Sequence, residues 1–306
     1  MSFENYFFDS EESNIESRED KNIYDLIRRN AEDLLEKFDF FDEKDVVEIN
    51  PEKVKEEVPV FVSPGWGSSP ESEMDTLKII SEEGERKVIT VNFSREEKIK
   101  DEDSGELPAA ELQKALAIID IINSKDLDCV DGIGHSEGGL NLAIAASLFP
   151  EKFRNLVFVC PAGSINVSRR ELAKRFVIDE RLEEIKNIDK TKIISFYTYL
   201  RSVIKNALKN PVLSNKEVTA MTELNIFEMT KWLKEKGVGV GFIASADDKV
   251  FPVDEINESV NNENIDNYIT TKGNHSAFVF DQQYARLVEN LLDNMKAKKT
   301  VAENNE

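Results

Sequence analysis

The feature that most constrains the fold of this chain is a Gly-x-Ser-x-Gly pentapeptide, in which Ser136 lies between Gly134 and Gly138. The residues before it (128–134) predict a short strand, and those after it (137–149) predict a buried apolar helix. A sharp strand-to-helix turn leaves little room for β-carbons two residues before and after the serine, so glycine suits both positions. The pattern predicts a nucleophile elbow that presents the Ser136 hydroxyl above a sheet edge. The alternative interpretation is a glycine-rich turn with a surface serine.

A nucleophilic serine needs a general base, and the chain contains only two histidines, His135 and His275. His135 adjoins the serine inside the turn, where its side chain points away from the position that a general base must occupy. His275 lies in a glycine-containing loop between a strand-like run (268–270) and a helix that Asp281 is expected to cap. His275 is therefore the candidate base, with an ordinary loop histidine as the alternative.

The candidate acid follows a run that predicts a buried strand (239–244) and precedes Pro252. The order serine, acid, histidine resembles that of the α/β-hydrolase superfamily, whose acid commonly precedes a proline by four residues. That spacing favours Asp248 over Asp247 as the acid that orients the histidine. The alternative role of Asp247 is to close the strand with an Asx-turn.

The resemblance also implies two backbone N–H donors that bind the oxyanion of a tetrahedral intermediate. One is the amide of Glu137, directly after the serine. The other is the amide of Trp66, in a loop after an early strand where many relatives carry His-Gly-x and this chain has Pro-Gly-Trp. Two positions stay open for the Trp66 side chain, which either lines an acyl pocket or packs under the N-terminal segment.

The rest of the chain alternates strands and helices, which predicts an α/β fold with a doubly wound, mostly parallel sheet covered by helices on both faces. With 306 residues and 40% hydrophobic content, the chain is long enough for one such core plus an insertion. The resemblance implies an α/β-hydrolase core built from residues 58–163 and 237–298. The predicted strands are 58–62, 87–93, 128–134 and 155–160, and the predicted helices are 107–123 and 137–149.

The segment between the two parts of the core (164–236) is predicted to be helical almost throughout. The superfamily places its lid at this point, above the serine, so the resemblance implies a helical cap. A pocket between an apolar cap and the sheet favours a small or medium acyl group over a polar substrate. The candidate helices are 168–187, 191–209, 215–222 and 225–236.

Acidic residues are more concentrated at the N-terminus than in the rest of the chain. The formal net charge of −21 excludes a nucleic-acid footprint and argues against an anionic membrane surface as partner. Residues 1–57 hold 19 acidic and 8 basic side chains and form an acidic extension. Its first part (1–20) is expected to be disordered and is followed by an amphipathic helix, which packs on the core or, alternatively, on a protein partner.

The compartment is predicted from absences in the sequence. The first residues lack the basic and then apolar order of a signal peptide, and no apolar run reaches membrane-spanning length, which predicts a cytoplasmic protein. Cys129 and Cys160 fall in or at the end of candidate core strands, so two buried reduced thiols are expected. Neither cysteine has the spacing of a metal site.

These motifs together predict a serine hydrolase that acts on a small-molecule acyl substrate through Ser136, His275 and Asp248 and an acyl-enzyme intermediate. A carboxylesterase of small or medium apolar esters fits best, and this chemistry requires no metal or organic cofactor. The alternatives on the same fold are a C–C bond hydrolase, a thioesterase, an acyltransferase and a non-catalytic ligand-binding protein.

Overall fold

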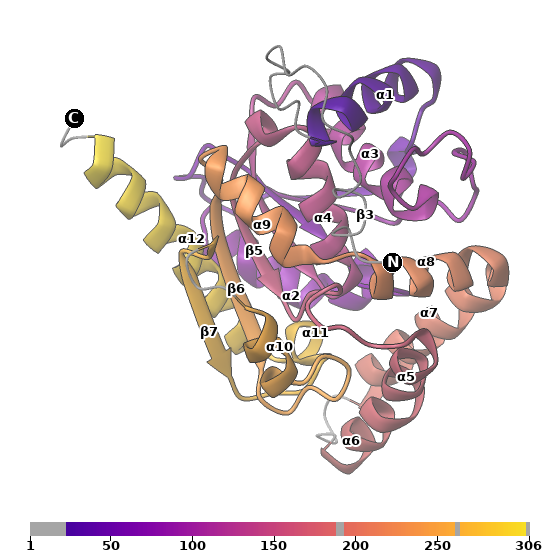
Figure 1. The fold of residues 1–306 in the computed structure, drawn as a ribbon. Coiled ribbons are helices and arrows are strands. Elements are labelled where there is room, and N and C mark those ends of the chain that lie inside the picture. Colours follow the sequence, from indigo (N-terminus) through magenta and orange to yellow (C-terminus); the bar gives the residue numbers. More distant parts are fainter. Residues whose placement is uncertain (1–22, 188–192, 261–263, 304–306) are drawn as a thin grey trace, which may run out of the picture.

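The computed structural model describes residues 23–187, 193–260 and 264–303 (Figure 1). Their strands form a seven-stranded sheet in the order β1-β3-β2-β4-β5-β6-β7. All neighbouring strands are parallel except β1, which pairs antiparallel with β3 at the edge. The mostly parallel sheet predicted from the sequence is therefore confirmed. The strands are β1 (Val46–Ile49), β2 (Val60–Ser63), β3 (Val88–Val91), β4 (Val130–His135), β5 (Phe153–Val159), β6 (Gly239–Ser245) and β7 (Asn267–Thr271).

Helices cover both faces of the sheet, because alternate residues of the central strands are apolar on both sides. In β5, Leu156 and Phe158 point into one core and Val157 and Val159 into the other. Strands buried on both faces read as continuous apolar runs, which is why the sequence located them. The first core also holds α3 (Ala109–Ser124), α4 (Glu137–Leu148) and α9 (Ile226–Glu235), and the second holds α2 (Pro70–Glu83) and α12 (Gln282–Glu303).

The segment inserted between β5 and β6 is helical, as expected, and its helices α5, α6 and α7 project from one side of the molecule (lower right in Figure 1). The predicted helix over 168–187 is interrupted, since a π-helical turn (Arg175–Asp179) separates α5 from α6. The helix predicted from residue 215 begins at Pro211, because proline is favoured in the first turn of a helix and Asn210 caps it. These helices are α5 (Arg169–Lys174), α6 (Glu180–Asn187), α7 (Ile193–Lys209), α8 (Pro211–Glu223) and α9.

The described part of the N-terminal extension packs on the core. The first helix, α1 (Ile23–Lys37), buries Ile27, Ala31 and Leu34, and Tyr24 stacks on Trp232 of α9 with ring centroids 5.6 Å apart. The extension also supplies the edge strand β1, which the sequence did not predict. Residues 1–20, which were expected to be disordered, lie outside the described residues.

Three helices were not predicted from the sequence: α2, α10 (Val253–Ser259) and α11 (Ala277–Phe280).

The expectation of two buried thiols is wrong for one cysteine, because Cys160 is buried but Cys129 is only half-buried, just before β4 begins. Of the helices in the described ranges, none combines the length and the apolarity that crossing a bilayer would need.

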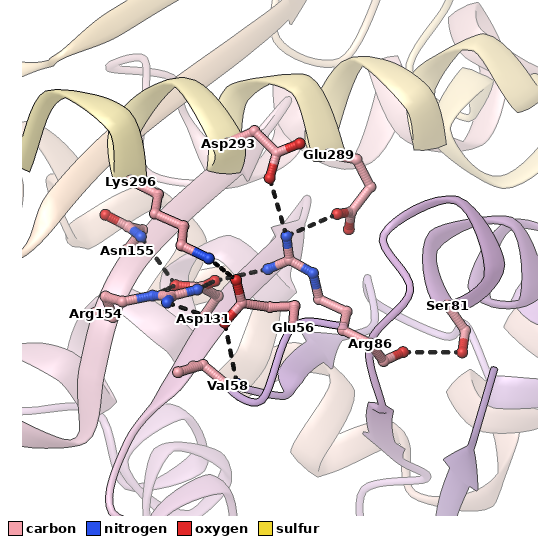
Figure 2. A network of polar contacts seen from close by, with 10 residues as sticks. All are labelled: Glu56, Val58, Ser81, Arg86, Asp131, Arg154, Asn155, Glu289, Asp293 and Lys296. Atoms are coloured by element: carbon pink, nitrogen blue, oxygen red, sulfur yellow. Dashed lines mark hydrogen bonds and ion pairs between the residues drawn. The ribbon is translucent and has the colours of Figure 1, made fainter. Parts of the chain in front are cut away.

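A buried polar network lies at the N-terminal end of β4 and joins it to neighbouring segments. Figure 2 shows its residues. Asp131 is fully buried and accepts hydrogen bonds from Arg86 at 2.8 Å, from Arg154 at 3.0 Å and from Asn155 at 3.0 Å. Arg86 is itself buried and also contacts Glu289 of α12 at 3.1 Å. Ser136 follows the opposite end of β4, so this network is separate from the predicted site.

Candidate functional site

The turn from β4 into α4 has the strained geometry of a nucleophile elbow. Ser136 lies at φ 54° and ψ −123°, a region that a non-glycine residue rarely adopts. A β-carbon at Gly134 would lie 2.4 Å from the Cα atom of Gly139, and one at Gly138 would lie 2.1 Å from the carbonyl oxygen of Ser63. Both positions therefore require glycine, for the reason that the spacing indicated.

The structure brings Ser136, His275 and Asp248 into one hydrogen-bonded chain, although they are far apart in the sequence. His275 Nε2 is 2.9 Å from Ser136 Oγ, and His275 Nδ1 is 2.9 Å from Asp248 Oδ2. A carboxylate only accepts, so Nδ1 carries the proton and Nε2 is free to accept from the serine hydroxyl. All three side chains are buried. The arrangement can move a proton from serine to histidine.

Asp248 is fixed by the backbone that follows it. Its Oδ1 accepts from the amides of Val250 at 2.7 Å and Phe251 at 2.9 Å, which leaves Oδ2 for the histidine. Asp247 is exposed, and its backbone N–H donates to the carbonyl oxygen of Gly273. The structure therefore places Asp248 beside His275, in the register that the proline spacing favours.

Electrostatics give the two histidines opposite pKa shifts. Burial lowers the pKa of His275, but the charge and hydrogen bond of Asp248 outweigh it, so the net pKa is raised. Burial, together with the neighbouring His275, lowers the pKa of His135 to about 3. The neutral His135 ring donates from Nε2 to the carbonyl oxygen of His275 at 2.9 Å. His135 thus supports the loop of the candidate base instead of reaching the serine hydroxyl.

The two expected oxyanion donors flank the serine. Glu137 is the first residue of α4, and amides in a first helical turn have no partner within the helix. The loop that carries Trp66 lies against Ser136, since a β-carbon at Gly65 would be 3.2 Å from the Ser136 β-carbon. The Trp66 ring lines the cavity at Ser136 and packs edge-on against Phe176, with centroids 5.4 Å apart. Of the two positions left open for this side chain, the structure has the one at the pocket.

A buried ionic cluster ties both donor residues to the inserted segment. Glu217 of α8 accepts from the Trp66 indole at 2.9 Å and contacts Lys114 at 2.8 Å, and Lys114 also contacts the Glu137 side chain at 2.7 Å. Burial raises the pKa of Glu217, but Lys114 and Arg95 outweigh it, so the net pKa is lowered. Glu217 therefore stays ionised under the loop of Trp66. Sequence reasoning missed this residue, because its partners come from three separate segments, at Trp66, Arg95 and Lys114, and no local spacing joins them.

A cavity of about 70 Å³ lies at the serine, between the catalytic loops and the inserted segment. Ser136 is the only hydroxyl-bearing side chain among its lining residues, and none of them is charged. The lining comes from the loop of Trp66, from the acid loop and from the inserted helices. The lining residues are Trp66, Ser136, Leu172, Ala173, Phe176, Val177, Val218, Met221, Val250 and Phe251.

One group of potential metal ligands exists among the described residues, formed by Cys160, Asp248 and His275, whose donor atoms lie within 4.8 Å of one another. Burial raises the pKa of the Cys160 thiol well above its usual value, so the thiol stays protonated and is a poor ligand. Its sulfur is 2.9 Å from the hydroxyl oxygen of Ser245. The group therefore fits a protonated thiol, hydrogen-bonded to Ser245 beside the candidate triad, better than a metal centre.

No protein-family model and no curated protein sequence matches the chain. Solved structures do. The chain is similar to the enol-lactonase from Burkholderia xenovorans LB400, with a TM-score of 0.60 at 12% identity over 81% of this chain and 96% of that one. It is also similar to a carboxylesterase structure from the thaumarchaeon Nitrososphaera gargenis, with a TM-score of 0.59 at 14% identity over 83% and 95%.

A third similar structure is MGS-MChE2, an alpha/beta hydrolase enzyme from the metagenome of sediments from the lagoon of Mar Chica, Morocco. Its TM-score is 0.52 at 14% identity, over 82% of this chain and 95% of that one. At such identities the similarity shows a common fold, and it confirms the fold class predicted from the motifs.

Proposed function

We propose that this protein, whose fold is that of the α/β hydrolases, is a serine hydrolase of small or medium uncharged esters. The observation that carries the proposal is the chain of two 2.9 Å hydrogen bonds from Ser136 through His275 to Asp248, which begins at a strained elbow. A fold alone does not define an activity, so the assignment rests on this site.

The proposed reaction uses these groups in two half-reactions. His275 takes the proton of the Ser136 hydroxyl as its oxygen attacks the ester carbonyl, and the amides of Glu137 and Trp66 hold the oxyanion. The tetrahedral intermediate collapses, the alcohol leaves with the proton of His275, and an acyl-enzyme remains. Water then attacks the acyl carbonyl with His275 again as base, which releases the acid and restores the serine. Asp248 stabilises the imidazolium throughout.

The substrate class follows from the cavity between the catalytic loops and the inserted segment, which we propose acts as a cap. A charged substrate would lose its hydration there without a charged partner, which is costly. An apolar acyl group has no such hydration to lose, and it gains free energy by burying its surface against Trp66, Phe176 and Met221. The uncharged lining therefore favours an ester with an apolar acyl group over a charged or strongly polar substrate.

The proposal is tested with a p-nitrophenyl ester series from acetate to palmitate. We expect one optimum at a short or medium acyl chain and a steep decline for longer chains, because the cavity at Ser136 holds only about 70 Å³. A fluorophosphonate probe should label Ser136 stoichiometrically. Labelling without turnover of any ester would favour an acyltransferase or a ligand-binding protein, and a preference for charged short esters would contradict the proposed substrate class.

The pH dependence of turnover reports on His275. A base must be neutral to accept the serine proton, so kcat/KM is expected to fall as the pH drops through the pKa of His275. Because Asp248 raises that pKa, the midpoint should lie above the model-peptide value of about 6.5. Asp248→Asn removes the charge and should move the midpoint to lower pH. A wild-type midpoint below 6 would contradict this assignment of the base.

A further inference from the structure

The inserted segment contributes a buried carboxylate to the catalytic loops. Glu180 is the first residue of α6, directly after the π-helical turn, and it is fully buried. Its Oε1 accepts from the backbone N–H of His275 at 2.8 Å, and its Oε2 accepts from the backbone N–H of Lys249 at 3.1 Å. One side chain therefore bridges the loop of the base and the loop of the acid.

This bridge holds the backbone of the two catalytic loops, which the hydrogen bonds within the triad do not hold. The hydrogen bond to Asp248 orients the His275 ring, but the position of the ring also depends on the backbone of its loop. Glu180 holds that backbone, and through Lys249 it holds the residue directly after Asp248. Small displacements of a catalytic group are costly, since a misplacement of about 1 Å can reduce turnover about 100-fold.

The charge of Glu180 also faces the imidazole. Its pKa is raised to about 7, mainly by burial and also by the charges of Asp248 and Glu184, against the lowering effect of charged His275. On its own element, Arg181 pairs with Glu184. From the acid loop, Lys249 offers its amide while its side chain is exposed. Ionised Glu180 is thus a second carboxylate beside His275 and helps Asp248 to raise the pKa of the base.

We propose that Glu180 is a positioning residue of the active site, which locks the loops of the base and the acid to the inserted segment. His275 then keeps its reactive position only while α6 is docked on the core. The inference rests on the proposed hydrolase function, because it concerns the same triad. It makes the inserted segment a part of the catalytic apparatus as well as a wall of the pocket.

The test compares Glu180→Gln with the wild type on the best p-nitrophenyl ester. Glutamine keeps the volume and one acceptor oxygen, but its NH₂ group meets an amide donor, so one of the two hydrogen bonds is lost. We expect kcat to fall about 10- to 100-fold with KM changed by less than about 2-fold. The acid limb of the pH profile should move to lower pH, because a negative charge near His275 is removed. Wild-type kcat with an unmoved limb would overturn the inference.

Glu289→Gln is the matched control. Glu289 is also buried, and burial raises its pKa to about 7 as well, but it contacts Arg86 at the far end of the sheet (Figure 2). This variant should lose stability and keep the wild-type kcat and pH profile. A fall in kcat equal to that of Glu180→Gln would mean that loss of stability explains both results, and the inference would be wrong.

Two measurements separate this inference from the proposed function and from a folding defect. If wild-type turnover survives Ser136→Ala, the proposed function fails, whatever Glu180 does. If Glu180→Gln does not fold, amide hydrogen exchange of the wild type still decides, because the inference requires the backbone N–H groups of His275 and Lys249 to be bonded to Glu180. Both amides should exchange much more slowly than the amides of exposed loops. Rapid exchange of either amide would overturn the inference.

Discussion

Ser136→Ala is expected to lower kcat/KM by about 10⁴- to 10⁶-fold, because nucleophile, base and acid act as a unit. The same change should shift the melting temperature by only a few degrees, since it removes one hydrogen bond worth about 1 kcal/mol. Alanine retains a β-carbon in the strained conformation at φ 54°, so the backbone strain is unchanged. Steady-state kinetics and thermal unfolding of the same preparation measure both quantities.

Four further variants make this result specific. His275→Ala should cost about as much as Ser136→Ala, and the double variant should lose little more, because the effects of one triad are not additive. Asp248→Asn should lower kcat about 10⁴-fold, whereas Asp247→Asn should leave it unchanged, since only Asp248 contacts the histidine. Loss of turnover in Asp247→Asn alone would reverse the assignment of the acid. Wild-type turnover in Ser136→Ala would place the nucleophile elsewhere.

The candidate triad could be predicted because each member has a local signature. Ser136 stands between glycines that the turn requires, His275 is one of only two histidines, and Asp248 precedes a proline at a fixed spacing. The central strands were located within three residues for a similar reason. They are buried on both faces, so β2 and β3 consist almost entirely of apolar residues. Strand β4 was located by its place before the Gly-x-Ser-x-Gly turn.

The contacts that hold the site together could not be predicted, because they join segments that no local pattern relates. Glu217 and Glu180 lie in helices with no motif around them, and only the packed structure places their carboxylates against the loop of Trp66 and the catalytic loops. Strand β1 was missed for a different reason. It is an edge strand whose residues are half-buried or exposed, so its sequence lacks the continuous apolar run of the central strands.

The largest effect on stability is expected from Asp131→Ala. Asp131 lies in the polar network of Figure 2, near the end of β4 opposite to Ser136. Asp131 accepts from Arg86 and Arg154, and Arg86 is fully buried. Removing one partner of a buried ion pair costs about 3–5 kcal/mol, because the remaining charge is left uncompensated. Domains are stable by only about 5–15 kcal/mol, so denaturant unfolding should show a loss of a large part of the total.

The same network supplies a control, because position in it decides the cost. Asp293 also contacts Arg86, but at 3.4 Å and with its side chain 69% exposed, so Asp293→Ala should cost no more than about 1 kcal/mol. Folded Asp131→Ala should keep the wild-type kcat, since the catalytic groups lie at the other end of the sheet. If both variants unfolded at the same denaturant concentration as the wild type, Asp131 would not compensate Arg86. The buried arginine would then have to be neutralised by Glu289 alone, whose raised pKa leaves it only partly charged near neutral pH.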